Sequence, residues 1–202
     1  MHQWHLGLDA ELAVGRELDQ LMRDSALVFH DLPAEKFNVD HVVIAPQGVF
    51  SVDTKGYTKR NRGGGADDAK VVYDGQTLVF PTWSSNKPPQ QAKRQAVWLA
   101  KWLSSATDEA VQVVPVLALP GWYIECEGRG DVLVFSGREL RKRLFRARTA
   151  QPIPPEQVQR IVHQVEQRCP NVQPGFSPEM KADAQARVAH TLPDERSHRT
   201  GA

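Results

Sequence analysis

Three charged side chains interrupt two segments whose other residues suit buried strands. In FNVDHVVIAPQGVFSVDTKGY, residues 37–57, Asp40 enters the first hydrophobic segment, and Asp53 and Lys55 end the second. Side chains two apart on a strand share a face, so Asp53 and Lys55 project together while Thr54 turns away. A buried charge is costly unless it is paired or holds a ligand. For Asp53 and Lys55 alone, a salt bridge at a strand end is the ordinary interpretation.

Asp40 favours a different interpretation. The tight turn at residues 45–48 makes the two strands antiparallel neighbours, which brings Asp40 close to Asp53. Two facing carboxylates repel each other unless a cation lies between them. Carboxylate oxygens suit Mg²⁺, which uses one or two of them together with waters and substrate phosphate. The alternative, in which Asp40 caps a strand or pairs with His41, stays open.

Two expected helices carry polar groups on faces that are otherwise apolar. Glu11 lies at the centre of the apolar arc of a helix over residues 8–24, although acidic residues also suit a first helical turn. A second helix begins at Pro88 and runs to about residue 104. Gln91 there could orient a water or a phosphate oxygen beside a metal. Ordinary polarity at a helix start is the alternative for Gln91 and the favoured interpretation of Gln95.

The remaining pattern predicts an α/β domain with a mixed sheet. Further strands are expected at 26–31, 39–45, 48–54, 111–119 and 131–135, a hairpin at 70–80 with an Asp74-Gly75 turn, and helices at 139–147 and 155–168. Hydrophobicity falls after Pro170, so residues 1–169 form the expected domain. Residues 170–202 form an expected tail that is partly disordered, with a short helix near 178–189 as one option.

Composition excludes several classes of protein. The 202 residues are 41% hydrophobic and carry a formal charge of +1, so a globally basic nucleic-acid coat is excluded. The two cysteines lack metal-ligand spacing, and no apolar run is long enough for a membrane span. We therefore expect a cytoplasmic protein without a membrane span in this chain.

Taken in order, these residues resemble the PD-(D/E)xK nuclease superfamily and, within it, the nuclease-related domain (NERD). The resemblance runs from about residue 7 to residue 135. It rests on GLDAELAVGRELDQL, FNVDHVVIAPQGVFSVDTKGY, NKPPQQAKRQAVWLAKWL and VVPVLAL. It implies a restriction-endonuclease-like core, in which a mixed central β-sheet is flanked by helices in αβββαβ order.

The resemblance also implies a site and an activity. The implied catalytic residues are Glu11, Asp40, Asp53, Lys55 and Gln91, and the implied ligands of Mg²⁺ or Mn²⁺ are Glu11, Asp40, Asp53 and the backbone carbonyl of Thr54. This domain more often has glutamate where Asp53 stands, and the shorter side chain bears on metal affinity. The expected function is metal-dependent hydrolysis of DNA phosphodiester bonds. The alternative is a non-catalytic DNA-binding or assembly module that retains the nuclease fold.

Basic and aromatic residues near this motif are expected to contact DNA. They are Lys59, Arg60 and Arg62 in the glycine-rich loop, Tyr57 before it, and Lys93 and Arg94 in the second long helix. Trp83 joins Tyr57 as a side chain able to stack on an unpaired base. A solvated surface loop is an equally good interpretation of the basic loop. The expected partners are DNA and a helicase or other DNA-processing protein, and a homodimer is left open.

Overall fold

The computed structural model describes residues 2–24, 26–59, 65, 67–146 and 152–169. The expected tail at 170–202, with its optional helix near 178–189, lies outside these residues, as do Arg60 and Arg62.

The core is a five-stranded mixed sheet with the strand order β1-β2-β3-β7-β9. Strands β1 (Leu27–Pro33), β2 (Asn38–Ala45) and β3 (Gly48–Thr54) form an antiparallel meander. Strand β7 (Val113–Ala118) pairs in parallel with β3, and β9 (Leu133–Phe135) pairs in parallel with β7. The parallel pairs require a crossover, and α2 supplies the one between β3 and β7.

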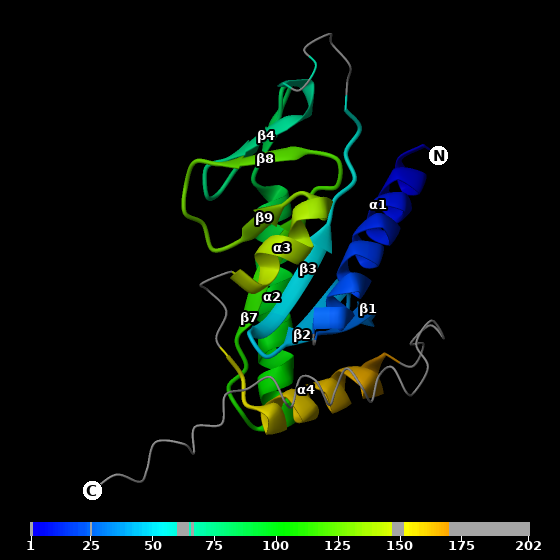
Figure 1. Ribbon diagram of the computed structural model, residues 1–202, viewed down its shortest axis with the longest axis vertical. Coiled ribbons are helices and arrows are strands. Elements are labelled where there is room, and N and C mark those ends of the chain that lie inside the picture. Colours follow the sequence, from blue (N-terminus) through cyan, green and yellow to red (C-terminus); the bar gives the residue numbers. More distant parts are fainter. Residues whose placement is uncertain (1, 25, 60–64, 66, 147–151, 170–202) are drawn as a thin grey trace, which may run out of the picture.

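Helices cover both faces of this sheet (Figure 1). The helix α1 (His2–Asp19), followed by a 3₁₀ turn (Gln20–Asp24), packs on one face together with the short α3 (Leu140–Arg143). The helices α2 (Lys87–Thr107) and α4 (Pro155–Arg168) pack on the other face. The predicted α/β class, with a mixed central sheet flanked by helices, is confirmed.

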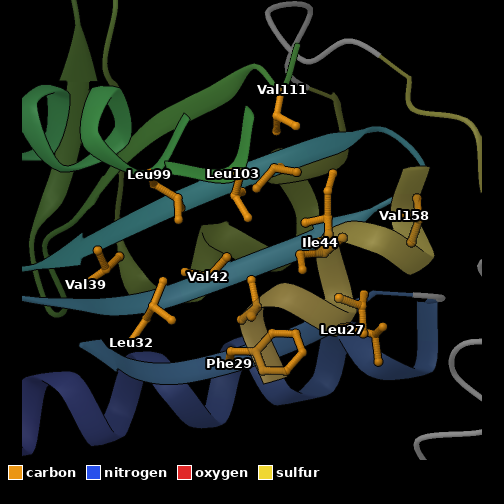
Figure 2. Packing of buried hydrophobic residues seen from close by; sticks show 14 of the residues in the cluster. Leu27, Phe29, Leu32, Val39, Val42, Ile44, Leu99, Leu103, Val111 and Val158 are labelled. Atoms are coloured by element: carbon orange, nitrogen blue, oxygen red, sulfur yellow. The ribbon is translucent and has the colours of Figure 1, made fainter. Parts of the chain in front are cut away.

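Alternation along the strands divides the core between these faces. In β2, Val42 and Ile44 belong to the cluster with α2 and α4, whereas Val43 and Ala45 belong to the cluster with α1. Figure 2 shows Leu99 and Leu103 of α2 meeting side chains of the sheet on the first of these faces. Strand β3 is buried along its whole length, so a polar side chain on it is costly unless it has a partner within the protein.

A second, smaller sheet lies beyond the carboxyl end of β3 (Figure 1). Its strand order is β6 (Ser84–Ser85), β5 (Leu78–Val79), β4 (Lys70–Tyr73) and β8 (Tyr123–Cys126). A 3₁₀ turn at Asp67–Ala69 precedes β4. Leu78 and Tyr73 of this sheet pack with Leu117 and Leu119, so the small sheet shares a third apolar cluster with the main one.

Two features of the small sheet differ from the sequence-based expectation. The predicted two-residue turn at Asp74-Gly75 is wrong, because Tyr73 pairs with Leu78 and residues 74–77 form the connection. The Asp74 carboxylate stabilises this longer turn by accepting the N–H groups of Gln76 and Thr77, each at 2.7 Å. The loop expected between 119 and 131 contains β8, in which no residue is buried and which is held by parallel pairing with β4.

The helix boundaries also differ in detail. The first helix begins at His2 rather than at residue 8, and its last predicted turn is 3₁₀. The second helix, α2, extends to Thr107. Asp108 follows as its C-cap, and the backbone of Asp108 is left-handed with φ +52°. The predicted helix at 139–147 consists of the short α3 between 3₁₀ turns at Gly137–Glu139 and Leu144–Arg146. The predicted helix at 155–168 is confirmed as α4.

Arg168, the last residue of α4, ties this helix to the rest of the domain. Its Nε donates a 2.6 Å hydrogen bond to the carbonyl of Pro33 in β1. The guanidinium carbon lies 5.2 Å from the ring centroid of Trp98 and 4.9 Å from that of Trp102, both on α2. One side chain thus joins α4 to the edge strand and to α2.

We expect Arg168→Ala to lower the free energy of unfolding by about 1–2 kcal/mol, because a cation–π contact and a hydrogen bond are lost together. Thermal unfolding should show a fall of about 2–8 °C in Tm. Arg160→Ala, which removes an exposed ion pair with Glu109, is the matched control and should change Tm little. Equal effects of the two substitutions would show that Arg168 does not tie α4 to the domain.

Candidate active site

Asp40 and Asp53 face each other across β2 and β3. The antiparallel register pairs His41 with Val52, and its continuation by one residue sets Asp40 opposite Asp53. The Oδ2 of Asp40 accepts a 2.7 Å hydrogen bond from the backbone N–H of Thr54, which fixes the carboxylate at the end of β3. Both acids therefore lie on the sheet face that α2 covers, at one end of the meander.

Asp53 is completely buried and is held by two side chains. The ammonium Nζ of Lys55 lies 3.0 Å from Oδ1 and 3.0 Å from Oδ2 of Asp53. The amide Nε2 of Gln91, from the first turns of α2, donates a 3.1 Å hydrogen bond to Oδ1. Asp53 thus links the end of β3 to α2 through Gln91, while Lys55 pairs with its charge.

The two carboxylates are held in an environment that opposes their charge. Burial raises the pKa of Asp40 to about 7, with the charge of Asp53 acting in the same direction and the Thr54 N–H and Lys55 opposing it. Burial also raises the pKa of Asp53, against the lowering effects of Lys55 and of the Gln95 and Gln91 amides. A cation between the two acids would relieve both the repulsion and the loss of solvation.

Glu11 lies within electrostatic reach of this pair but is less buried. Burial raises its pKa most, followed by the charge of Asp31. Lys55 lowers that pKa, and Asp53 raises it slightly. Among the residues that the structure describes, no three His, Cys, Asp or Glu side chains are grouped so as to hold a metal ion. Metal ligation by Asp40, Asp53, Glu11 and the Thr54 carbonyl therefore stays a prediction.

This donor set fits one hard divalent cation. Mg²⁺ typically binds through one or two carboxylates and keeps several waters. Asp40 and Asp53 supply two carboxylates on one face, and Asp40 Oδ1 is not engaged by the Thr54 hydrogen bond. The residues are thus compatible with a two-carboxylate site beside a lysine.

Gln95 is a site residue that sequence reasoning missed. The sequence favours ordinary helix-start polarity for Gln95, but Gln95 is only 4% exposed and its amide lowers the pKa of Asp53. Its Oε1 is buried without a hydrogen-bond partner in the described part of the chain. The signal was available in the sequence, because Gln91 and Gln95 are one helical turn apart and share a face.

The family model of the nuclease-related domain, NERD, matches residues 6–120, which is more than half of the chain. The chain belongs to the NERD family. The matched range contains Glu11, Asp40, Asp53, Lys55 and Gln91. No match was found among curated proteins or among solved structures. In the part of the chain that the structure describes, no helix is long and apolar enough to cross a membrane.

On the opposite face of the sheet, the NERD domain carries a histidine pair. The Nδ1 atoms of His30 and His41 lie 2.8 Å apart, and His30 Nε2 lies 3.0 Å from Asp19 Oδ1. Burial, with a smaller contribution from His30, lowers the pKa of His41 to about 3, so this ring is neutral at physiological pH. The alternative in which Asp40 pairs with His41 is wrong, because alternation directs the two side chains to opposite faces.

The residues expected to contact DNA have diverse surroundings in this NERD domain. Tyr57 packs against Phe80 and Trp83, and Lys59 is exposed with its Nζ 5.8 Å from the Trp122 ring centroid. Lys93 forms an ion pair with Asp131, which offsets part of its charge. Arg94 is exposed. The other two arginines expected to contact DNA, Arg60 and Arg62, lie outside the described residues.

Proposed function

We propose that this NERD domain is a divalent-metal-dependent nuclease that hydrolyses DNA phosphodiester bonds. The observation that carries the proposal is the arrangement of two facing acids and a lysine. Asp53 is fully buried opposite Asp40, and the Lys55 ammonium lies 3.0 Å from both oxygens of Asp53. The Thr54 N–H gives Asp40 one backbone partner at the strand end. A structural ion pair between Asp53 and Lys55 does not itself require this second carboxylate, which raises the electrostatic cost of the site.

In this proposal Asp40 and Asp53 hold Mg²⁺ or Mn²⁺, and Glu11 and the Thr54 carbonyl are further ligands. When bound, the ion would polarise the phosphodiester and lower the pKa of a coordinated water. The Lys55 ammonium offsets the negative charge that grows on the phosphorus centre as water attacks. Gln91 orients Asp53 through its amide and can orient the attacking water with its other polar atom.

DNA lies across the end of β3 in this proposal. Lys59, Arg60, Arg62 and Arg94 approach its backbone, and Lys93 does so if its ion pair with Asp131 opens. Tyr57 is one of the aromatic side chains that can meet an unpaired base. The chain carries a formal charge of only +1, so its affinity depends on these local groups and falls with rising salt. The hydrolase is expected to work with a helicase or another DNA-processing protein that presents the substrate.

One observation favours a rival function, a DNA-binding or assembly module without catalysis. Both oxygens of Asp53 already contact the Lys55 ammonium, and the described residues contain no three-ligand group for a metal. In that case Asp53 and Lys55 stabilise the strand end and DNA is bound without being cut. The two functions differ in one measurable respect, which is the dependence of cleavage on a divalent ion.

The proposal is tested by incubating the purified chain with labelled single-stranded and double-stranded DNA in Mg²⁺, Mn²⁺, Ca²⁺ or a chelator. We expect cleavage with Mg²⁺ or Mn²⁺ and none with the chelator. Retention of DNA on a filter, measured in the same buffers, separates binding from cutting. Retention without cleavage in any divalent ion would establish the binding module instead.

A further inference from the structure

A turn at the tip of the small sheet fixes two aromatic rings against each other. Phe80 and Trp83 flank Pro81 and Thr82, and the Phe80 N–H donates a 2.8 Å hydrogen bond to the Trp83 carbonyl. The pairing of Val79 with Ser84 places Phe80 and Trp83 opposite each other on the same face of this hairpin. Their rings are stacked, with centroids 4.0 Å apart and an interplanar angle of 9°.

Phe80 covers one face of the Trp83 ring, and Trp83 keeps part of its surface exposed. Tyr57 stands nearly perpendicular to both stacked rings, with its centroid 5.0 Å from Trp83 and 5.3 Å from Phe80. Tyr57 is almost equally distant from the two rings, whereas a ring lying over the outer face of Trp83 would be much farther from Phe80 than from Trp83. Tyr57 therefore lies beside the stack. Trp83 is 40% exposed, whereas Phe80 beneath it is 4% exposed. Trp83 is thus partly exposed to solvent and is supported on one face by Phe80.

This aromatic support is joined to the candidate active site. Tyr57 is two residues beyond Lys55, and the Trp122 indole N–H donates a 3.3 Å hydrogen bond to the Tyr57 carbonyl. Trp122 also contacts Phe80 edge-on, with ring centroids 5.1 Å apart. Burial raises the pKa of Tyr57, and the negative charge of Asp53 contributes. Lys59 extends over Trp122, so a cation lies beside the stack and suits a phosphate.

We propose that the outer face of Trp83 binds an unpaired nucleobase, which makes single-stranded DNA the preferred substrate of the site. This inference rests on the proposed function and names the substrate that the function leaves open. A base in a duplex already has both of its faces stacked on its neighbours, so only an unpaired base can offer one to Trp83. Phe80 and Tyr57 hold the indole in place, which reduces the conformational entropy that binding would otherwise cost. Lys59 accompanies the base by contacting the adjacent phosphate.

The test measures binding in chelator, so that it does not depend on cleavage. Fluorescence anisotropy compares a thymidine oligonucleotide, the same oligonucleotide with abasic positions, and a duplex of equal length. The proteins are wild type, Trp83→Ala, Trp83→Phe and Tyr123→Ala, the last of which removes an exposed ring of the same small sheet outside the aromatic stack. Thermal unfolding of each variant verifies that the domain is folded.

We expect wild type to bind the thymidine strand about 5- to 150-fold more tightly than the abasic strand, which corresponds to the stacking of one base. Trp83→Ala should lose this preference with little change in abasic or duplex binding. Trp83→Phe should retain most of it, and Tyr123→Ala all of it. Equal weakening of all three ligands by Trp83→Ala, or no weakening, would overturn the inference. Cleavage without base preference would contradict this inference alone, whereas Trp83-dependent binding without cleavage would contradict only the nuclease activity.

Discussion

Replacing Lys55 by alanine is expected to lower the rate of DNA cleavage roughly 10²–10³-fold while DNA affinity stays nearly unchanged. The reason is that the ammonium acts on charge that develops only in the transition state, so its loss appears in turnover and not in ground-state binding. In the structure this ammonium lies 3.0 Å from both oxygens of Asp53, at the end of β3. Single-turnover cleavage at saturating DNA, together with the salt dependence of binding, measures the two effects separately.

Lys59→Ala is the matched control for Lys55→Ala. Lys59 is an exposed lysine four residues farther along the chain, beside Trp122. Its loss should weaken DNA binding and reduce the salt dependence, with near-normal cleavage at saturation. Because Lys55→Ala leaves Asp53 buried with fewer partners, Lys55→Met is a second variant that keeps most of the apolar packing. If either Lys55 variant lost affinity and kept its rate, Lys55 would be a phosphate anchor and not a catalytic group.

Asp40→Asn is expected to weaken divalent-cation affinity by more than the roughly 10–100-fold that is typical when a residue supporting a metal ligand is lost. It should also abolish cleavage, while the fold is preserved. Asparagine can still accept the Thr54 N–H with its side-chain oxygen, but it brings no negative charge to face Asp53. Calorimetric titration with Mn²⁺ measures the affinity. Asp131→Asn, at an exposed acid paired with Lys93, is the matched control and should bind Mn²⁺ like wild type.

The same substitution should stabilise the metal-free protein at pH 8 by about 1–4 kcal/mol, or about 2–16 °C in Tm. The pKa of Asp40 is raised from its ordinary value of 3.8 to about 7, so the folded state keeps a proton that the unfolded state releases between those values. Stability of the wild type therefore falls as pH rises from about 4 to about 7, and Asp40→Asn lacks this fall. The two proteins should melt alike near pH 4 and diverge above pH 7. Parallel melting curves across this range would contradict the raised pKa of Asp40, which burial causes first and the charge of Asp53 second.

The central part of the fold follows from hydrophobic patterning. Residues 39–45 and 48–54 are mostly apolar and lie on either side of a tight turn. Strands β2 and β3 could therefore be predicted almost residue for residue. The register of that hairpin in turn sets Asp40 opposite Asp53, which is why the acid pair could be anticipated. Helix α4 could be predicted for a similar reason, because its apolar residues recur with helical spacing after two prolines.

Elements held by long-range pairing could not be predicted in the same way. Strand β8 has an exposed Tyr123 and little apolar alternation, and it is a strand because β4 lies beside it. The aromatic group around the Phe80–Trp83 stack has the same origin, since Tyr57, Phe80 and Trp122 come from three segments that only the fold brings together. Gln95 was misjudged because helix-start polarity and burial against Asp53 look alike until the helix is placed on the sheet.

The most direct measurement is cleavage of end-labelled single-stranded DNA by wild type and Lys55→Ala purified in parallel, each with Mn²⁺ and with chelator. We expect wild type with Mn²⁺ to cut the strand and the other three reactions to leave it nearly intact. The Lys55→Ala preparation reports any contaminating nuclease, because a contaminant would be present in both. Cleavage at equal rates by the two proteins, or no cleavage by wild type with Mn²⁺, would contradict a metal-dependent active site built on Asp40, Asp53 and Lys55.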